Sequence, residues 1–146
     1  MNESDWYQFI GTIHGLSFAF NILLVVISDA HGFLWMRGKL TVLPARRMKR
    51  LHQAIGVGLT VSVLTGAYLA STELAYLLTV PAFYAKLVFV AALVANAFVI
   101  GRHLTIATTT PYDGVAKDTK RTLVISGAVS TIGWIGAFIA AQFLGL

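Results

Sequence analysis

Two ionisable side chains, His14 and Lys86, lie inside long apolar stretches of the sequence. Counted at about 1.5 Å per helical residue, His14 would lie about 12 Å below Trp6 and Lys86 about 8 Å below Pro81, which are similar depths. A lysine in hydrocarbon costs at least about 2.5 kcal/mol unless it is paired, neutral or facing a polar space. An imidazole and an amine at one depth could ligate iron or transfer a proton. A snorkelling lysine and a packing histidine are the simpler alternatives.

A polar stripe runs along the apolar segment that carries His14. At 100° per residue, Ser17, Asn21 and Ser28 fall within about 60° of His14, and Asp29 lies about 60° away on the other flank. Lipid cannot satisfy hydrogen-bonding groups. The stripe is therefore predicted to face partner helices, an internal cavity or a bound cofactor, and Asn21 is a candidate cofactor-binding residue.

A second polar group is expected where the first apolar segment ends and the second begins. Asp29 and His31 end the first segment, and His52 starts the second. A helical hairpin could bring the three together, and one carboxylate with two imidazoles can bind Zn²⁺, Fe²⁺ or Cu²⁺. The alternative is a set of interfacial polar residues in which Asp29 pairs with the neighbouring basic loop.

The elements that must position these groups are four apolar segments, each near the roughly 20 residues that a helix needs to cross about 30 Å of hydrocarbon. They cover residues 6–28, 52–71, 81–103 and 122–145. The 146 residues are 57% hydrophobic and 12% charged, and the mean hydropathy of +0.76 is too high for a soluble domain. We predict an all-α integral membrane four-helix bundle that forms one transmembrane domain over residues 1–146. The first residues are acidic and not basic like a signal peptide, so the first segment is expected to remain as a span.

The basic residues gather in two of the three loops. Every lysine and arginine except Lys86 lies either between the first and second segments or between Arg102, at the end of the third segment, and the start of the fourth. The positive-inside rule therefore predicts that both basic loops are cytoplasmic and that the N- and C-termini are outside. We expect a multi-pass protein of a bacterial inner membrane, with the lipid bilayer as its surroundings. The net charge of +5 reflects this topology, and no nucleic acid partner is expected, because the basic residues are not interleaved with aromatic residues on a polar surface.

Other features are expected to serve structure. The second and fourth segments are rich in Gly, Ala and Ser at three- and four-residue spacing, which lets helices approach closely in lipid. Trp35 is predicted to be an interface anchor. The first basic loop is expected to fix topology or to lie on anionic headgroups, and the second, residues 108–118, to be an ordinary connection.

Several kinds of site are excluded by what the sequence lacks. The chain has no cysteine, which excludes disulfides, thiolate-bound metals and iron–sulfur clusters. It has no Gly-rich phosphate loop, no His-Glu-x-x-His motif and no paired carboxylates within the apolar segments. No segment carries two histidines at the spacing of a two-haem cytochrome bundle, but histidines on different helices could hold one haem between them.

Three short motifs carry a resemblance to a known family. They are Ile13-His14-Gly15, the basic stretch Arg46–Leu51 that runs into Leu64-Thr-Gly-Ala-Tyr-Leu69, and Ala85-Lys86-Leu-Val-Phe-Val90. Together they resemble HemJ-type protoporphyrinogen oxidases and the related copper-resistance-D-like membrane domains, over about residues 8–104. The resemblance implies haem binding and oxidase activity, and it implies that His14 and Lys86 matter for both.

Three functions remain open from the sequence. The first is a haem b membrane redox protein, such as a protoporphyrinogen-oxidase-like enzyme, in which His14 is an axial ligand and Asn21 also contacts the cofactor. Lys86 would be its second ligand, propionate partner or proton donor. The second is a non-catalytic accessory or assembly subunit without a cofactor, packed in a homo-oligomer or against other membrane subunits. The third is a membrane protein that binds or transports a divalent metal through Asp29, His31 and His52.

Overall fold

The structure, a computed structural model, describes residues 2–144, and within them it consists of helices and short loops. The long helices are α1 (Glu3–Met36), α2 (Ala45–Thr72), α4 (Pro81–Thr109) and α5 (Lys117–Gln142), and the short ones are α3 (Leu74–Leu77) and the 3-10 turn η1 (Tyr112–Gly114). The four long helices are each long and apolar enough to cross a membrane. The predicted all-α architecture with four apolar helices is therefore confirmed. Residue 145, the end of the predicted fourth span, lies outside the described residues.

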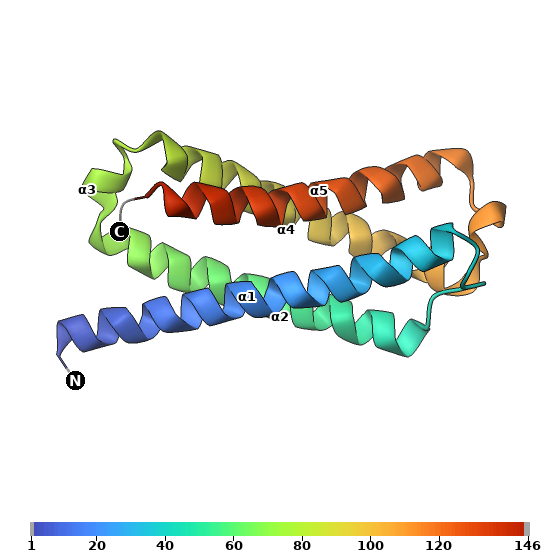
Figure 1. The fold of residues 1–146 in the computed structure, drawn as a ribbon, viewed down its shortest axis with the longest axis horizontal. Helices are drawn as coiled ribbons and strands as arrows, with labels where there is room; N and C mark the ends of the chain where they lie inside the picture. Colours follow the sequence, from blue (N-terminus) through green and yellow to red (C-terminus); the bar gives the residue numbers. More distant parts are fainter. Residues whose placement is uncertain (1, 145–146) are drawn as a thin grey trace.

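The four long helices form two antiparallel hairpins, α1 with α2 and α4 with α5 (Figure 1). Packing is most extensive within each hairpin, and α2 with α4 makes the main contact between the hairpins. The start of α1, the end of α5 and α3 lie at one end of the bundle, which we call the α3 end. The two basic loops lie at the other, which we call the loop end. Space between the hairpins is therefore bounded by all four long helices.

The outer surface of the bundle is apolar, as a lipid-facing surface requires. Large hydrophobic side chains are well exposed on each long helix, for example Leu16 at 66%, Leu64 at 65%, Phe98 at 70% and Ile132 at 61%. A soluble domain of this size would not expose so much apolar surface. The burial pattern therefore agrees with the hydropathy of the helices.

The helices extend further at the loop end than the apolar segments indicate. Helix α1 continues through Asp29 and His31 to Met36, and α2 begins at Ala45. The prediction that Asp29 and His31 end the first helix is wrong, because Gly32 stays helical and the backbone leaves the helix only before Gly38, whose φ is +69°. Pro44 then precedes the next helix as its N-cap. Hydropathy marks where a helix can cross lipid, whereas hydrogen bonding decides where it ends.

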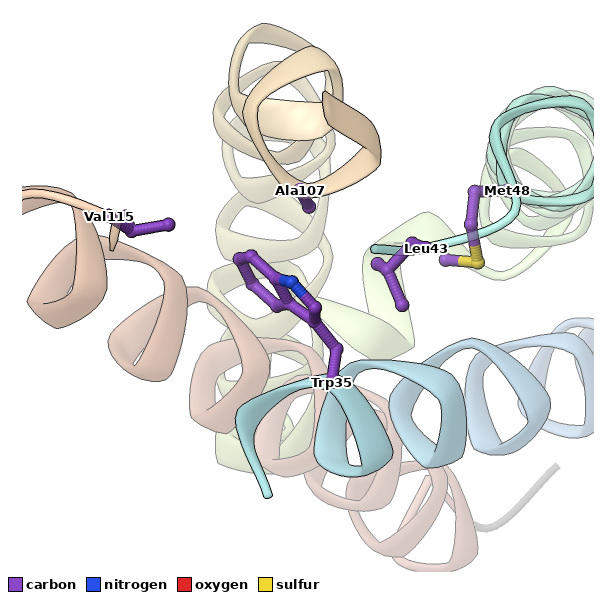
Figure 2. Packing of buried hydrophobic residues seen from close by; sticks show 5 residues of the cluster. All are labelled: Trp35, Leu43, Met48, Ala107 and Val115. Atoms are coloured by element: carbon purple, nitrogen blue, oxygen red, sulfur yellow. The ribbon is translucent and has the colours of Figure 1, made fainter. Parts of the chain in front are cut away.

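A buried hydrophobic cluster closes the loop end (Figure 2). It consists of Trp35, Leu43, Met48, Ala107 and Val115. Trp35 is 2% exposed, and its indole Nε1 donates a hydrogen bond of 3.1 Å to the backbone oxygen of Thr110. The Leu43 amide donates to the Ala107 carbonyl at 2.9 Å. The prediction that Trp35 anchors the membrane interface is therefore wrong, because both loops fold over it and bury it, and the second loop is part of this closure.

Glycines on α2 and α5 allow close helix contacts within this chain. A Cβ on Gly58 would overlap the side chain of Asn21 on α1, and a Cβ on Gly136 would overlap that of Phe89 on α4. A Cβ on Gly133 would lie 2.8 Å from a methyl carbon of Leu93. The predicted small-residue faces thus serve packing inside the bundle, α2 against α1 and α5 against α4.

Candidate functional site

A cavity of about 690 Å³ lies between the two hairpins near the α3 end. All four long helices and α3 line it, mostly with apolar side chains such as Phe18, Leu87 and Trp134. Its volume falls within the range of about 300–1,000 Å³ that is typical of small-molecule sites. The cavity is therefore a candidate site for an apolar ligand of moderate size.

His14 of α1 and Lys86 of α4 both lie on the wall of this cavity. They are far apart in the sequence, and the packing of one hairpin against the other brings them to a common space. Each is partly buried. The sequence prediction that both face one polar or functional space is consistent with this placement.

The hydrogen bonds around His14 favour the tautomer with the proton on Nδ1. The Thr65 hydroxyl has one hydrogen, which it donates to the Val61 carbonyl at 2.7 Å. While that hydrogen is donated to Val61, the Thr65 oxygen, 3.0 Å from His14 Nδ1, can only accept a hydrogen from Nδ1. The neutral imidazole then has a free lone pair on Nε2, and no partner for Nε2 is found within residues 2–144. His14 is thus prepared to act as a metal ligand or as a proton acceptor through Nε2.

Gly66 fixes the position of the same ring. A Cβ on Gly66 would lie 3.0 Å from His14 Cε1, so that the imidazole rests directly against the backbone of α2. The ring is therefore held by its hydrogen bond to the Thr65 oxygen and by contact with Gly66, one residue further along α2. A ligand that approaches Nε2 would meet an imidazole that is already oriented.

Lys86 has a different environment from His14. Within the described residues its amine has no hydrogen-bond or ion-pair partner, and its side chain reaches the cavity. A partly buried ammonium group without a partner favours an anionic ligand group or water beside it. Lys86 can therefore supply either a positive charge or a proton to whatever the cavity holds.

The rest of the polar stripe on α1 packs against α2. Ser17 donates to the His14 carbonyl at 2.9 Å and meets the Ser62 hydroxyl at 2.8 Å. Asn21 is completely buried against Gly58, and neither polar atom of its amide has a hydrogen-bond partner in the described residues. Asn21 is not among the residues that line the cavity. The residue predicted to contact a cofactor thus lies in a helix contact in this structure.

The three residues predicted to bind a divalent metal do not come together. His31 Nδ1 donates to the Ile27 carbonyl at 2.7 Å, and its Nε2 accepts from Arg47 at 3.3 Å, so neither nitrogen is free for a metal. Asp29 accepts a hydrogen bond of 3.2 Å from Thr131 on α5. Within residues 2–144 no group of three His, Cys, Asp or Glu residues could hold a metal ion. Asp29, His31 and His52 therefore do not form the expected three-residue cluster in this structure.

Asp29 and His52 nevertheless share a second, smaller cavity of about 50 Å³ toward the loop end. Its other polar lining residues are Ser28, Asn96 and Ser130. Asn96 also forms two hydrogen bonds with Ser126 of α5, one to its carbonyl at 2.9 Å and one from its hydroxyl at 2.7 Å. The sequence did not indicate Ser130 or the bond between Asn96 and Ser126, because both depend on how α4 and α5 pair.

The chain matches no protein-family model, no curated protein and no solved structure in three separate comparisons. Functional inference therefore depends on the residues of the two cavities. The larger cavity combines apolar walls, one oriented imidazole and one amine without a partner. Such a site can hold an apolar molecule, with an imidazole that can ligate a metal and an amine that can bind an acidic group.

Proposed function

We propose that this protein is a membrane redox protein that binds haem b in the larger cavity. The observation that carries the proposal is the free Nε2 lone pair of His14 beside a cavity of about 690 Å³. A histidine whose Nδ1–H is hydrogen-bonded is the common form of a metal-ligating imidazole. The resemblance of the motifs around His14 and Lys86 to HemJ-type oxidases supports the same assignment and extends it to an oxidoreductase that acts on a porphyrin-like substrate.

The residues of the cavity fit a haem in three respects. The apolar walls suit the macrocycle, His14 Nε2 suits the iron, and the Lys86 amine suits a propionate or a second axial position. Haem would supply one-electron chemistry when bound. The chain itself would orient the ligand through Thr65 and Gly66, exclude bulk water with apolar side chains, and hold or release a proton at Lys86 Nζ.

Topology and location form part of the same proposal. We infer that both basic loops face the cytoplasm and that the α3 end faces outward, as in a protein of a bacterial inner membrane. The support is that both basic loops lie at one end of the bundle (Figure 1). Because the chain has no cysteine, a single cysteine at Ser4 should react with a membrane-impermeant maleimide in intact cells. A single cysteine at Lys117 should react only after the membrane is opened.

The visible absorption spectrum tests haem binding directly. Protein expressed with added haem and purified in detergent should show a Soret band and sharpened α and β bands after dithionite reduction. His14→Ala should remove these bands. His103→Ala is the matched control, because His103 Nδ1 bonds within α4 to the Val99 carbonyl at 2.8 Å and His103 lies outside the cavity lining.

The spectra of the variants decide the assignment. Loss of bound haem in His14→Ala with retention in His103→Ala supports His14 as the ligand. A flat spectrum of the wild-type protein, or an unchanged spectrum in His14→Ala, contradicts the proposal. Lys86→Met should retain haem with an altered spectrum if Lys86 is a ligand, and with an unaltered spectrum if it contacts a propionate.

A further inference from the structure

The two internal cavities lie in line along the bundle and are separated by one apolar layer. Leu59, Leu93 and Trp134 belong to the lining of both cavities. The same three side chains form a buried cluster with Val25. The partition is therefore one side chain thick on the path between the cavities, and α2, α4 and α5 each contribute to it.

The partition is tightly packed. The ring of Phe18 lies edge-on to Trp134 with the ring centroids 5.2 Å apart. Leu93 rests against Gly133, where an added Cβ would lie 2.8 Å from its methyl carbon. Leu93 and Trp134 are each 4% exposed. A dry apolar layer of this kind stops water and ions, as hydrophobic constrictions do in channels.

The smaller cavity on the loop side of the partition is polar enough to be hydrated. Its volume of about 50 Å³ has room for about three to five water molecules, each of which needs roughly 10–15 Å³ of this volume. Asp29 bonds only to Thr131 within the described residues, and for His52 and Ser130 no side-chain hydrogen bond is found there. Polar groups at this depth need partners. Water in the cavity would supply them from helices α1, α2, α4 and α5.

We propose that the two cavities are the two halves of a proton path through the bundle and that Leu59, Leu93 and Trp134 form the gate that closes it. In the smaller cavity, which is the inner half of the path, Asp29 and His52 are the groups that hold a proton. The water that connects them is bound by Ser28, Asn96 and Ser130. Each transfer breaks one O–H or N–H bond and forms another, so no oxidant or reductant is needed. The path does not depend on a cofactor in the larger cavity, although a redox site there could use its protons.

The apolar gate is the barrier between the two cavities in this structure. The Trp35 cluster covers the loop end, beyond the smaller cavity, and Met48 belongs both to that cluster and to the cavity lining. The gate of Leu59, Leu93 and Trp134 closes the other side. The smaller cavity itself is only partly enclosed, so the gate is the barrier that a proton would have to pass to reach the larger cavity. Shortening one of the three gate side chains should connect the smaller cavity with the larger one.

Proton flux into liposomes tests the gate. Purified protein is reconstituted without haem, a potassium diffusion potential is imposed with valinomycin, and internal acidification is followed with a pH-sensitive dye. Leu93→Ala should increase proton influx several-fold over the wild-type protein. Val94→Ala is the matched control, because Val94 is the adjacent residue of α4 and is 36% exposed on its outer side. Adding Asp29→Asn to Leu93→Ala should reduce the influx again.

Two flux results would overturn the proposal. The first is a folded Leu93→Ala protein with no more influx than Val94→Ala, and the second is an increased influx that Asp29→Asn does not reduce, which would indicate a general leak. If Leu93→Ala does not fold, Leu59→Ala makes the same test on α2. Circular dichroism and gel filtration establish which variants are folded.

A measurement on the unmodified protein makes the proposal independent of the variants. Water-edited solid-state NMR in bilayers should show transfer of magnetisation from water to Ser28 and Ser130, but little to the methyl groups of Leu93. Absence of magnetisation transfer from water to both serines would overturn the proposal that the smaller cavity holds the water of the path. Because no haem is present in either experiment, these results and the visible spectrum can fail separately.

Discussion

The hydroxyl of Thr65 accepts a hydrogen bond from His14 Nδ1 at 3.0 Å while it donates to the Val61 carbonyl at 2.7 Å. This pair of bonds is what leaves Nε2 of His14 free to bind a metal. Thr65→Val keeps the shape of the side chain and removes the acceptor, so the imidazole loses the partner that fixes its tautomer. We expect haem affinity to fall about 10- to 100-fold, as for other partners of metal-bound histidines. Titration of haem-free protein with haem measures the change.

Thr60→Val is the control for this prediction. Thr60 lies on the same helix, and its hydroxyl bonds only within α2, to the Gly56 carbonyl at 2.9 Å. It also lies outside the lining of the larger cavity. Haem affinity should be unchanged in Thr60→Val, and an equal loss in both variants would show that Thr65 has no special role.

The two buried asparagines should respond in opposite ways to the same substitution. Asn21 is buried without a hydrogen-bond partner in the described residues, so Asn21→Leu should raise the free energy of unfolding by about 1 kcal/mol. Asn96 makes two bonds to Ser126, so Asn96→Leu should lower it by about 1–2 kcal/mol. Denaturation of the detergent-solubilised protein with increasing SDS compares the two. Similar losses in both variants would mean that Asn21 also has a stabilising partner.

Close approach of α1 and α2 at Gly58 predicts a coupling between two positions. Gly58→Ala should destabilise the protein, because the new methyl group would overlap the Asn21 side chain. Asn21→Ala makes room for it, so the double variant should recover part of the loss, with a coupling energy of about 0.5–3 kcal/mol. Gly127→Ala should be neutral or stabilising, because an added Cβ there meets nothing within 4 Å. Additive effects of the two substitutions would argue against this contact.

Burial of Trp35 predicts that the loop end depends on it for stability. Trp35→Ala should cost about 3–5 kcal/mol, as expected for a fully buried large side chain. Trp35→Phe should cost only about 0.5–1.5 kcal/mol, because it mainly loses the bond to the Thr110 carbonyl. Proteolysis at Arg46 and Arg47 should become faster in Trp35→Ala as the loops loosen. Trp6→Ala, at a position that is 41% exposed, is the control and should change neither property.

The four long apolar helices and the inward-facing polar stripe were readable in the sequence. Long apolar runs predicted the four helices, because each run has the length and hydropathy that a helix needs to cross the hydrocarbon of a membrane. The sequence also indicated that the polar stripe headed by His14 would face inward. Both predictions depend on local spacing along one helix, which the amino-acid order contains directly.

Tertiary packing decided how the polar residues are partnered. His31 and His52 look equivalent in the sequence. In the structure, however, Arg47 is hydrogen-bonded to His31, whereas His52 lines a cavity. Trp35 looks like an interface residue, but two loops from different hairpins bury it. Whether a side chain meets a cavity, a glycine or another polar group depends on the rotation and register of one helix against the next. Many weak contacts along the whole interface set that register together, and no short stretch of sequence determines it alone.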